Sequence, residues 1–182
     1  MISILTADGF EEIEAITVYD VVKRIGKRAE FISINEDDVV EGSNGANLRC
    51  DKCISDFTLD GVDALVLPGG LPGAANLGES TEVRTIIAEA VKKDIHIGAI
   101  CAAPLFVIDK MEEFHGKSLC LYPDLAKELK NTTYKDADVF VDGKLITGKG
   151  PSKAMKFALS ILENVYGKAV AEEAAEDLLF ED

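Results

Sequence analysis

The sequence predicts an α/β protein in which a mostly parallel, flavodoxin-like sheet lies between two helical layers. Short apolar runs alternate along the chain with segments whose apolar residues recur at a helical period. This alternation is typical of parallel sheets that helices cover on both faces. No repeat or linker interrupts it, and 182 residues suit one domain. We therefore expect a single three-layer α/β/α sandwich over residues 1–182, with a nucleophile elbow at Cys101.

The first half of the chain is expected to supply three strands of the sheet and two of its helices. Strands are predicted where apolar residues form short runs, and helices where they recur at i, i+3 and i+4. Gly26 is a stop signal for the first helix. The predicted strands are 2–7, 29–34 and 63–68, and the predicted helices are 11–25 and 81–94. The turn-rich stretch 36–60 predicts short strands or a hairpin, and 69–78 reads as a loop.

The second half continues the alternation and ends in two helices. An Asp-Gly pair at Asp142 predicts a hairpin turn. Pro151 is typical of a first helical turn, and Gly167 of a helix end. The predicted strands are 96–100, 117–122, 138–141 and 144–147, and the predicted helices are 102–111, 151–167 and the acidic segment 168–182.

The charge and the apolar runs exclude several classes of partner. Nineteen Lys and Arg residues against 33 Asp and Glu residues give a formal net charge of −14, so the chain repels nucleic-acid backbones. The longest apolar run, 97–108, is shorter than the ~20 residues of a membrane span. Acidic residues at 11, 12 and 14 argue against a signal peptide. We expect a cytoplasmic protein with neither nucleic acid nor membrane as partner.

The cysteines do not predict a disulfide scaffold or a metal site. The chain has four, which is too few for such a scaffold, and the expected compartment is reducing. Cys50 and Cys53 form a C-x-x-C pair, but a structural zinc site needs four ligands and no second pair exists. The surrounding residues resemble strand and turn rather than the helix start of a thioredoxin-type motif. We expect no metal and no cofactor, with these two cysteines as partly exposed bystanders.

Three segments place reactive groups where a parallel sheet usually binds ligands, at the carboxyl ends of its strands. These segments carry Glu14, the pair Gly69-Gly70, and Cys101. Small residues two positions either side of Cys101 suit an elbow, and the amide of Ala102 would point at an oxyanion there. Gly70, which lacks a Cβ, could bring a second amide close. On the pattern alone, the alternative is a cysteine packed in the core.

Four motifs together resemble the ThiJ/PfpI superfamily, which has the class I glutamine amidotransferase-like fold. They are GFEEIEA at 9–15, VLPGG at 66–70 with GAANL at 73–77, AICAAP at 99–104, and GKGP at 148–151. The chain is most similar to the branch that contains the parkinsonism-associated deglycase and its chaperone-like relatives. The resemblance extends from residue 2 to about residue 167.

The resemblance implies a site. Cys101 matches the family's reactive cysteine, and Glu14 matches the acid that hydrogen-bonds to it. Gly70 and Ala102 match the backbone donors, and the pocket positions fall on Gly69, Tyr122, Gly150 and Pro151. A protonated carboxyl and a helix N-terminus both favour a thiolate, so we expect a depressed pKa for Cys101. The family also implies a homodimer that buries part of helix 11–25.

The chain departs from its relatives by lacking their histidine. Some members have one directly after the cysteine, where this chain has Ala102, and others have one at the position of Tyr122. His96 and His115 are expected roughly 15 Å or more from Cys101, at the far ends of a strand and a helix. A protease-type Cys–His dyad is therefore disfavoured.

Two functions fit these residues. The first is a glyoxalase or deglycase enzyme that acts on reactive dicarbonyls such as methylglyoxal, or on their adducts, through Cys101 and Glu14. The alternative is a redox-sensing chaperone of the same family, in which Cys101 is oxidised and no turnover occurs. Both use the same side chains, so the sequence does not separate them.

Overall fold

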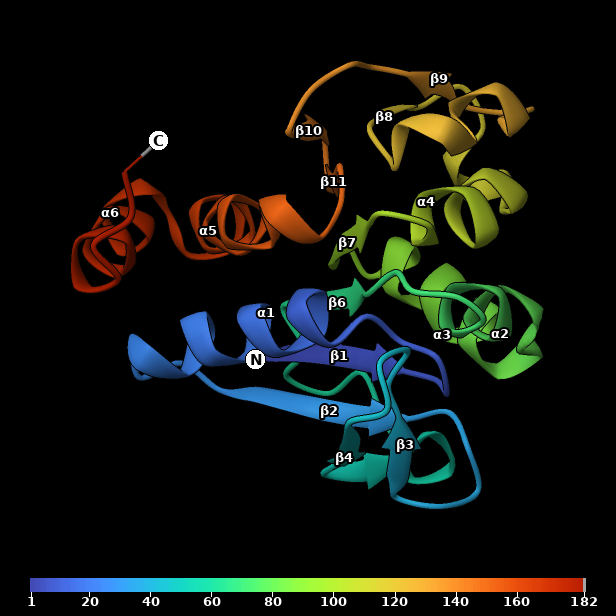
Figure 1. The fold of residues 1–182 in the computed structure, drawn as a ribbon, viewed down its shortest axis with the longest axis horizontal. Coiled ribbons are helices and arrows are strands. Elements are labelled where there is room, and N and C mark those ends of the chain that lie inside the picture. The colour runs from blue at the N-terminus through green and yellow to red at the C-terminus, as the bar shows by residue number, and fades with distance from the viewer. Residues whose placement is uncertain (182) are drawn as a thin grey trace.

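The computed structural model describes residues 1–181 and contains a central sheet of seven strands (Figure 1). The strand order is β10-β11-β7-β6-β1-β2-β5, and every neighbouring pair is parallel except the β10–β11 hairpin. The strands are β1 (Ile2–Thr6), β2 (Ala29–Ser33), β5 (Lys52–Cys53), β6 (Ala64–Leu67), β7 (His96–Ile100), β10 (Val139–Asp142) and β11 (Leu145–Gly148).

Helices cover both faces of this sheet, which confirms the predicted fold class. One face carries α1 (Glu12–Arg24), α5 (Ala154–Tyr166) and α6 (Lys168–Asp177), and the other carries α2 (Gly73–Glu79), α3 (Thr81–Lys92) and α4 (Ala103–Phe106) (Figure 1). Alternation along the strands separates two apolar cores, because successive side chains point to opposite faces. Leu65 and Leu67 pack towards α2, α3 and α4, whereas Ala64 and Val66 pack towards α1 and α5.

Shorter elements complete the chain. β3 (Val39–Glu41) and β4 (Asn47–Arg49) form an antiparallel hairpin outside the main sheet, and β8 (Ser118–Leu119) pairs with β9 (Thr133–Tyr134). Turns of 3₁₀ helix lie at Ile54–Asp56, Ile108–Lys110, Glu112–Phe114, Pro123–Glu128 and Pro151–Lys153. Among residues 1–181, no helix has the length and apolarity that a membrane span requires.

Four predicted elements differ from the structure. The expected loop 69–78 contains α2, and the expected helix 102–111 is the short α4 followed by a 3₁₀ turn. The predicted strand 117–122 has two paired residues and lies outside the main sheet. The last helix was predicted over 168–182, whereas α6 ends at Asp177; Asp182 lies outside the described residues.

Backbone packing explains two of these differences. Gly78 of α2 lies against the carbonyl of Phe106 at the end of α4, so closely that a Cβ at Gly78 would overlap it. This contact packs the two short helices against each other, with Gly78 buried between them. The sequence shows the small residues of 73–78, but their helical conformation depends on a partner that is distant along the chain.

We predict that Gly78→Ala destabilises the protein. Alanine is the better helix former by about 1 kcal/mol, but here its Cβ overlaps the Phe106 carbonyl, and overpacking costs about 1–3 kcal/mol. Thermal unfolding should therefore show a lower Tm. Glu79→Ala, at an exposed position on the same helix, is the control and should change stability by about 0.5 kcal/mol or less. A Tm for Gly78→Ala at or above that of the wild type would contradict the packing argument.

Candidate active site

Cys101 occupies a sharp turn between β7 and α4. Its φ is 62°, in the left-handed region that non-glycine residues seldom adopt. The Cys101 amide donates to the Gly148 carbonyl at 2.9 Å, which holds the strand end against β11. Ala99 and Ala103 are fully buried on either side, so larger side chains would have no room. The predicted elbow is therefore present, with its thiol half-buried at the carboxyl edge of the sheet.

Glu14 reaches the same point from the first turn of α1. Its side chain is fully buried, and its Oε2 accepts a hydrogen bond from the Gly69 amide at 2.7 Å. Its Oε1 is buried and has no conventional hydrogen-bond partner among residues 1–181. The Cys101 thiol interacts with this carboxyl, since each group influences the pKa of the other through a hydrogen bond. The carboxyl is thus anchored on one side and faces the thiol.

Gly69 lies close to both of these side chains. A Cβ at this residue would lie 2.7 Å from the Cys101 Cβ, 2.7 Å from Glu14 Oε2 and 3.0 Å from the Ala102 amide nitrogen. No side chain fits at such distances, so the Gly69 backbone packs directly against both the acid and the thiol. The sequence placed Gly69 in the pocket, and the structure brings it together with Cys101, Glu14 and Ala102.

Two backbone amides approach the sulfur. The Gly70 and Ala102 amides both face the Cys101 Sγ and lower the pKa of the thiol. Gly70 has a φ of 85°, and a Cβ there would overlap the Glu11 backbone, so glycine is needed for this approach. An oxyanion formed beside the sulfur would lie within reach of both donors.

Tyr122 and Gly150 lie beside the thiol, and Pro151 is the next residue after Gly150. A Cβ at Gly150 would be 4.0 Å from the Cys101 Sγ and 3.5 Å from Tyr122 Cδ2. The Tyr122 amide donates to the Cys101 carbonyl at 3.0 Å, and its side chain is 45% exposed. Pro151 begins the 3₁₀ turn that leads into α5. Tyr122 therefore forms an exposed wall beside the sulfur.

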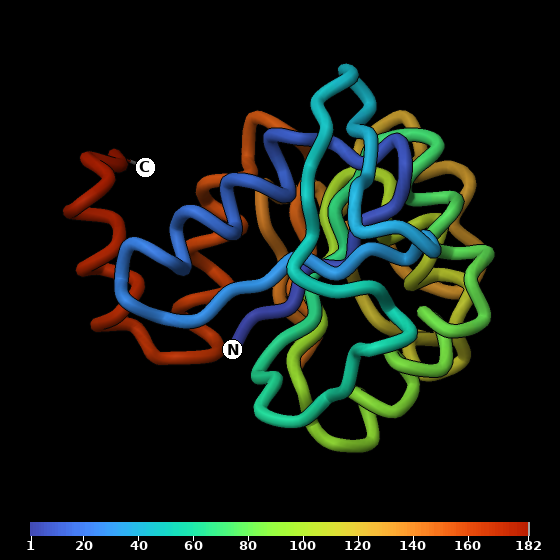
Figure 2. The backbone as a smooth tube through the Cα atoms, turned by 90° about the horizontal axis from the view of Figure 1, so that it is seen from below, coloured from blue at the N-terminus to red at the C-terminus, as the bar shows by residue number. Residues whose placement is uncertain are grey.

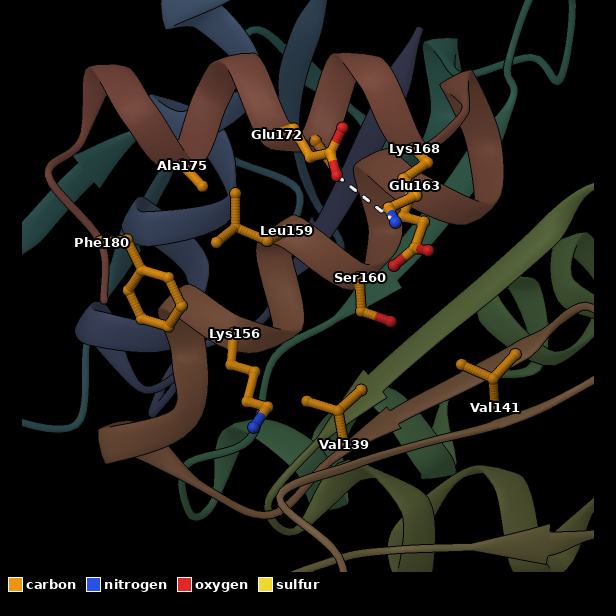
Figure 3. A pocket seen from close by; sticks show the side chains of 11 residues that line it. Val139, Val141, Lys156, Leu159, Ser160, Glu163, Lys168, Glu172, Ala175 and Phe180 are labelled. Atoms are coloured by element: carbon orange, nitrogen blue, oxygen red, sulfur yellow. Dashed lines mark ion pairs between the residues drawn. The ribbon is translucent and has the colours of Figure 1, made fainter. Parts of the chain in front are cut away.

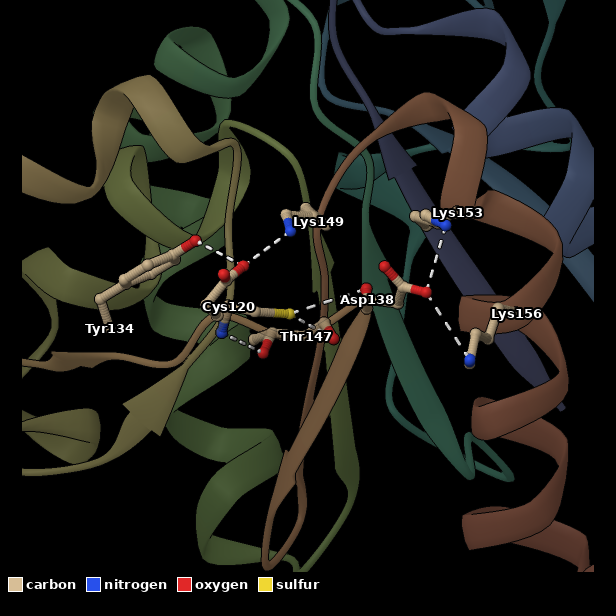
Figure 4. Close-up of polar contacts among 8 residues, drawn as sticks. Cys120, Tyr134, Asp138, Thr147, Lys149, Lys153 and Lys156 are labelled. Atoms are coloured by element: carbon tan, nitrogen blue, oxygen red, sulfur yellow. Dashed lines mark hydrogen bonds and ion pairs between the residues drawn. The ribbon is translucent and has the colours of Figure 1, made fainter. Parts of the chain in front are cut away.

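Ion pairs surround the segment that carries Gly150 (Figure 4). Lys149 pairs with Asp136 at 2.7 Å, and Lys153 pairs with Asp138 at 3.1 Å. Behind them, the buried Cys120 donates its thiol hydrogen to the Thr147 carbonyl at 3.1 Å. Cys120 is therefore a packed structural residue, as its position in an apolar run predicts.

The pKa values of Glu14 and Cys101 are both raised, and that of Cys101 differs from the one expected from the sequence. Burial raises the pKa of Glu14 to about 7, with a further contribution from the negative charge of Glu11. Burial, the charge of Glu14 and the hydrogen bond to Glu14 raise the pKa of Cys101 to about 12, although the Gly70 and Ala102 amides lower it. The expected depressed pKa of Cys101 is therefore wrong.

Two causes raise the pKa of Cys101, and neither can be seen in the sequence. The thiol is desolvated by its neighbours, and the carboxylate beside it opposes a second negative charge. In addition, α4 has only four residues, so its dipole contributes little. Because Glu14 titrates near neutrality, it can accept a proton from the thiol and return it at physiological pH.

Sequence reasoning missed three residues around the site. Glu11 caps α1 and influences Glu14 electrostatically, and Glu12 binds the β3–β4 hairpin. Leu71 follows Gly70 and is 54% exposed beside the site. The two acids were visible in the GFEEIE motif, but only their contacts distinguish their roles. No sequence signal singled out Leu71.

Two other features lie apart from Cys101. Cys50 was expected to be partly exposed, but it is buried and shares a 3.2 Å hydrogen bond with Thr6; Cys53 is half-buried. A hollow of about 610 Å³ lies between β10, α5 and α6, with Leu159 and Phe180 in its wall and the Lys168–Glu172 ion pair at its rim (Figure 3). Among residues 1–181, no cluster of three or more acidic, cysteine or histidine side chains is arranged to hold a metal ion.

The chain is similar in sequence and in structure to known members of one protein family. The DJ-1/PfpI family profile matches residues 1–164. Protein dj-1beta of Drosophila melanogaster is 36% identical over 178 residues, which are 97% of this chain and 95% of that protein. The glutathione-independent glyoxalase DJR-1.2 of Caenorhabditis elegans is 31% identical, over 90% of this chain and 87% of that protein. The structure of oxidized DJ-1 from Toxoplasma gondii matches with a TM-score of 0.93 and 29% identity, over 100% of this chain and 98% of that chain.

We predict that Glu14 makes stability depend on pH. Its pKa rises from 4.5 in the unfolded chain to about 7 in the fold, so its stabilising effect is complete below pH 4.5 and is lost as pH rises through 7. Glu14→Gln does not titrate. The Tm of this variant relative to the wild type should therefore increase from about pH 5 to about pH 8, equivalent to roughly 3 kcal/mol or less. A difference that stays constant across this range would contradict the raised pKa.

Proposed function

The chain belongs to the DJ-1/PfpI family, and from this premise we propose that it is a cysteine-dependent enzyme that acts on reactive dicarbonyls such as methylglyoxal. Cys101 is the nucleophile and Glu14 is the general acid and base. The observation that carries this proposal is the isolated pair itself: a thiol at a positive φ with two amides near its sulfur, beside a buried carboxyl whose Oε1 has no conventional partner in the described chain.

The first step joins the sulfur to the aldehyde. Glu14 takes the thiol proton while the Cys101 Sγ attacks the aldehyde carbon, and the C=O electron pair moves to oxygen. The Gly70 and Ala102 amides, which already approach the sulfur, stabilise the developing oxyanion. Glu14 then returns the proton to that oxygen. The product is a neutral hemithioacetal, and the carboxylate is free again.

The second stage rearranges the hemithioacetal and releases the product. Glu14 removes the proton from the carbon bonded to sulfur and delivers it to the neighbouring carbon, while the hydroxyl proton moves to the former ketone oxygen. The result is a thioester of lactate. Water then attacks the thioester, the C–S bond breaks, and the sulfur regains its proton. A group with a pKa of about 7 suits these transfers in both directions.

No histidine takes part in this scheme. His96 is at the start of β7, at the opposite end of the strand from Cys101, and His115 follows the 3₁₀ turn at Glu112–Phe114. Glu14 is therefore the proton carrier that the geometry favours, and a protease-type dyad is disfavoured. The same addition to carbonyl carbon extends to the amine or thiol adducts of dicarbonyls, which a deglycase hydrolyses. The four free cysteines favour a reducing compartment such as the cytoplasm.

Redox sensing by a chaperone-like protein is the second candidate function. A peroxide would oxidise the Cys101 thiol to a sulfenic acid and release water, and a second peroxide would yield the sulfinic acid. The added oxygens need hydrogen-bond donors, and the Gly70 and Ala102 amides lie beside the sulfur. The Toxoplasma gondii relative was solved in an oxidized form. This observation supports a test of oxidation alongside turnover.

We also propose a homodimer that covers α1. Ile13 and Ile16 lie on the outer face of this helix and are 55% and 44% exposed. They are separated by one helical turn, so they form a single apolar strip that a second copy can bury. The same helix carries Glu14 on its inner face.

The catalytic proposal predicts a specific pH profile. Pure wild-type protein should form lactate from methylglyoxal, with kcat/KM rising through about pH 7 as Glu14 becomes the carboxylate that accepts the thiol proton. Cys101→Ser should abolish turnover. Glu14→Gln should lower kcat roughly 10²–10⁴-fold and remove the inflection near pH 7.

The same preparations distinguish the two candidate functions. Mass spectrometry after mild peroxide treatment reports the oxidation state of Cys101. Oxidation of Cys101 without any lactate formation would favour redox sensing. Turnover that survives in Glu14→Gln within threefold would contradict the role of Glu14.

The dimer proposal predicts that a charge on α1 separates the subunits. Ile16→Glu places like charges on both copies, so light scattering at tens of micromolar should report a monomer where the wild type is a dimer. Val141→Glu is the matched control, because Val141 is 38% exposed on β10 and should leave the dimer intact. A monomeric wild type would overturn the proposal.

A further inference from the structure

The β3–β4 hairpin lies outside the main sheet and packs on the segment that leads into α1 (Figure 2). The Gly9 amide donates to the Glu41 carbonyl at 2.7 Å, and the Ser43 amide donates to the Phe10 carbonyl at 2.8 Å. The Glu41 amide donates to Asp8 Oδ1 at 2.9 Å. The hairpin therefore contacts the turn just before Glu14, although it contributes no side chain to the site.

Glu12 binds the tip of this hairpin with both carboxylate oxygens. Its Oε1 accepts from the Asn44 amide at 2.8 Å and the Ala46 amide at 3.4 Å. Its Oε2 accepts from Asn44 Nδ2 at 2.9 Å and Ser43 Oγ at 3.2 Å. Burial alone would raise the pKa of Glu12, but these hydrogen bonds hold it at about 2. The carboxylate is therefore ionised at physiological pH and keeps all four donors.

The opposite side of the same turn binds the glycine loop of the site. The Glu11 amide donates to the Gly69 carbonyl at 3.0 Å, and the Gly73 amide donates to the Gly9 carbonyl at 3.2 Å. The Gly69 amide in turn donates to Glu14 Oε2. Residues 9–12 thus lie between the hairpin and the loop that carries Gly69 and Gly70.

The position of Glu14 depends on this layered arrangement. Its carboxyl has one conventional hydrogen bond within residues 1–181, from Gly69, and its Oε1 has none. One bond does not fix both the distance and the direction of a carboxyl relative to the thiol. The backbone of the first turn of α1 must supply the remaining constraint. Glu12 makes four hydrogen bonds from this turn to the hairpin, and Glu11 adds one, from Ser43 Oγ at 3.2 Å.

We propose that Glu12 is a positioning residue that acts through Glu14: by binding the hairpin, it holds the first turn of α1 where the Glu14 carboxyl meets Cys101. The turnover measurements below rest on the proposed function, whereas the alkylation measurements do not. The β3–β4 hairpin then supports the position of Glu14, although it contributes no side chain to the site.

The test compares Glu12→Ala and Glu12→Gln with the wild type. Glu12→Ala removes all four hydrogen bonds, and Glu12→Gln keeps an oxygen for the Asn44 and Ala46 amides. With methylglyoxal as substrate, Glu12→Ala should lower kcat about tenfold or more with KM within threefold, because misplacement of a catalytic group by ~1 Å costs up to about 10²-fold. Glu12→Gln should restore kcat to within about threefold of the wild type.

A double-mutant cycle separates positioning from general destabilisation. Iodoacetamide labelling of Cys101 at pH 8, followed by mass spectrometry, should be accelerated by Glu12→Ala in the otherwise wild-type protein, because the Glu14 carboxylate that raises the pKa of the thiol is displaced. Glu12→Ala should not accelerate labelling in the Glu14→Gln background. Ser80→Ala is the control: it removes the hydroxyl that caps α3, at a cost of about 1 kcal/mol, and should leave kcat and labelling unchanged.

The outcomes are distinct. Equal acceleration of labelling by Glu12→Ala in both backgrounds, no acceleration in either, or a kcat loss that Ser80→Ala reproduces would overturn the proposal. Failure of Glu12→Gln to restore kcat would also overturn it. If the wild type forms no lactate, the proposed function fails, and the labelling cycle still decides the role of Glu12.

Discussion

The close approach of three backbone segments around Gly69 is the constraint on which the site depends. The end of β6, the first turn of α1 and the elbow after β7 meet here with no room for a single additional carbon. Parallel neighbours make this meeting possible, because β6 pairs with both β1 and β7 and all three strands end at the same edge. The acid and the thiol are therefore brought together by the sheet.

This constraint also sets the chemistry of the pair. The close packing of the three segments removes water from Glu14, and this desolvation raises the pKa of its carboxyl towards neutrality. The same packing places the charge of the ionised Glu14 next to Cys101. The charge of Glu14 therefore opposes a charge on the half-buried Cys101 thiol beside it. The role that we propose for Glu14 depends on its burial as much as on its identity, because an exposed glutamate would stay ionised at neutral pH.

Much of this arrangement was predictable from the sequence, for identifiable reasons. The elbow at Cys101 and the acid at Glu14 follow local signals: small residues at a strand end, and a short acidic motif at a helix start. The helix α2, the shortness of α4 and the burial of Cys50 depend on contacts between distant segments, such as Gly78 with Phe106 and Cys50 with Thr6. The raised pKa of Cys101 belongs to the same class, because desolvation is set by neighbours from several elements.

The source of the two donors near the sulfur has a consequence for the evolution of specificity. The Gly70 and Ala102 amides belong to the main chain, so replacement of a side chain cannot delete them while the turn persists. Tyr122 and Leu71, in contrast, are exposed next to this machinery, and neither donates to the sulfur. Substitutions during evolution can therefore change Tyr122 and Leu71 one at a time, while the Gly70 and Ala102 amides keep their positions near the sulfur. In the enzyme that we propose, a lineage that carries this turn can acquire new substrates while the two amides near the sulfur stay in place.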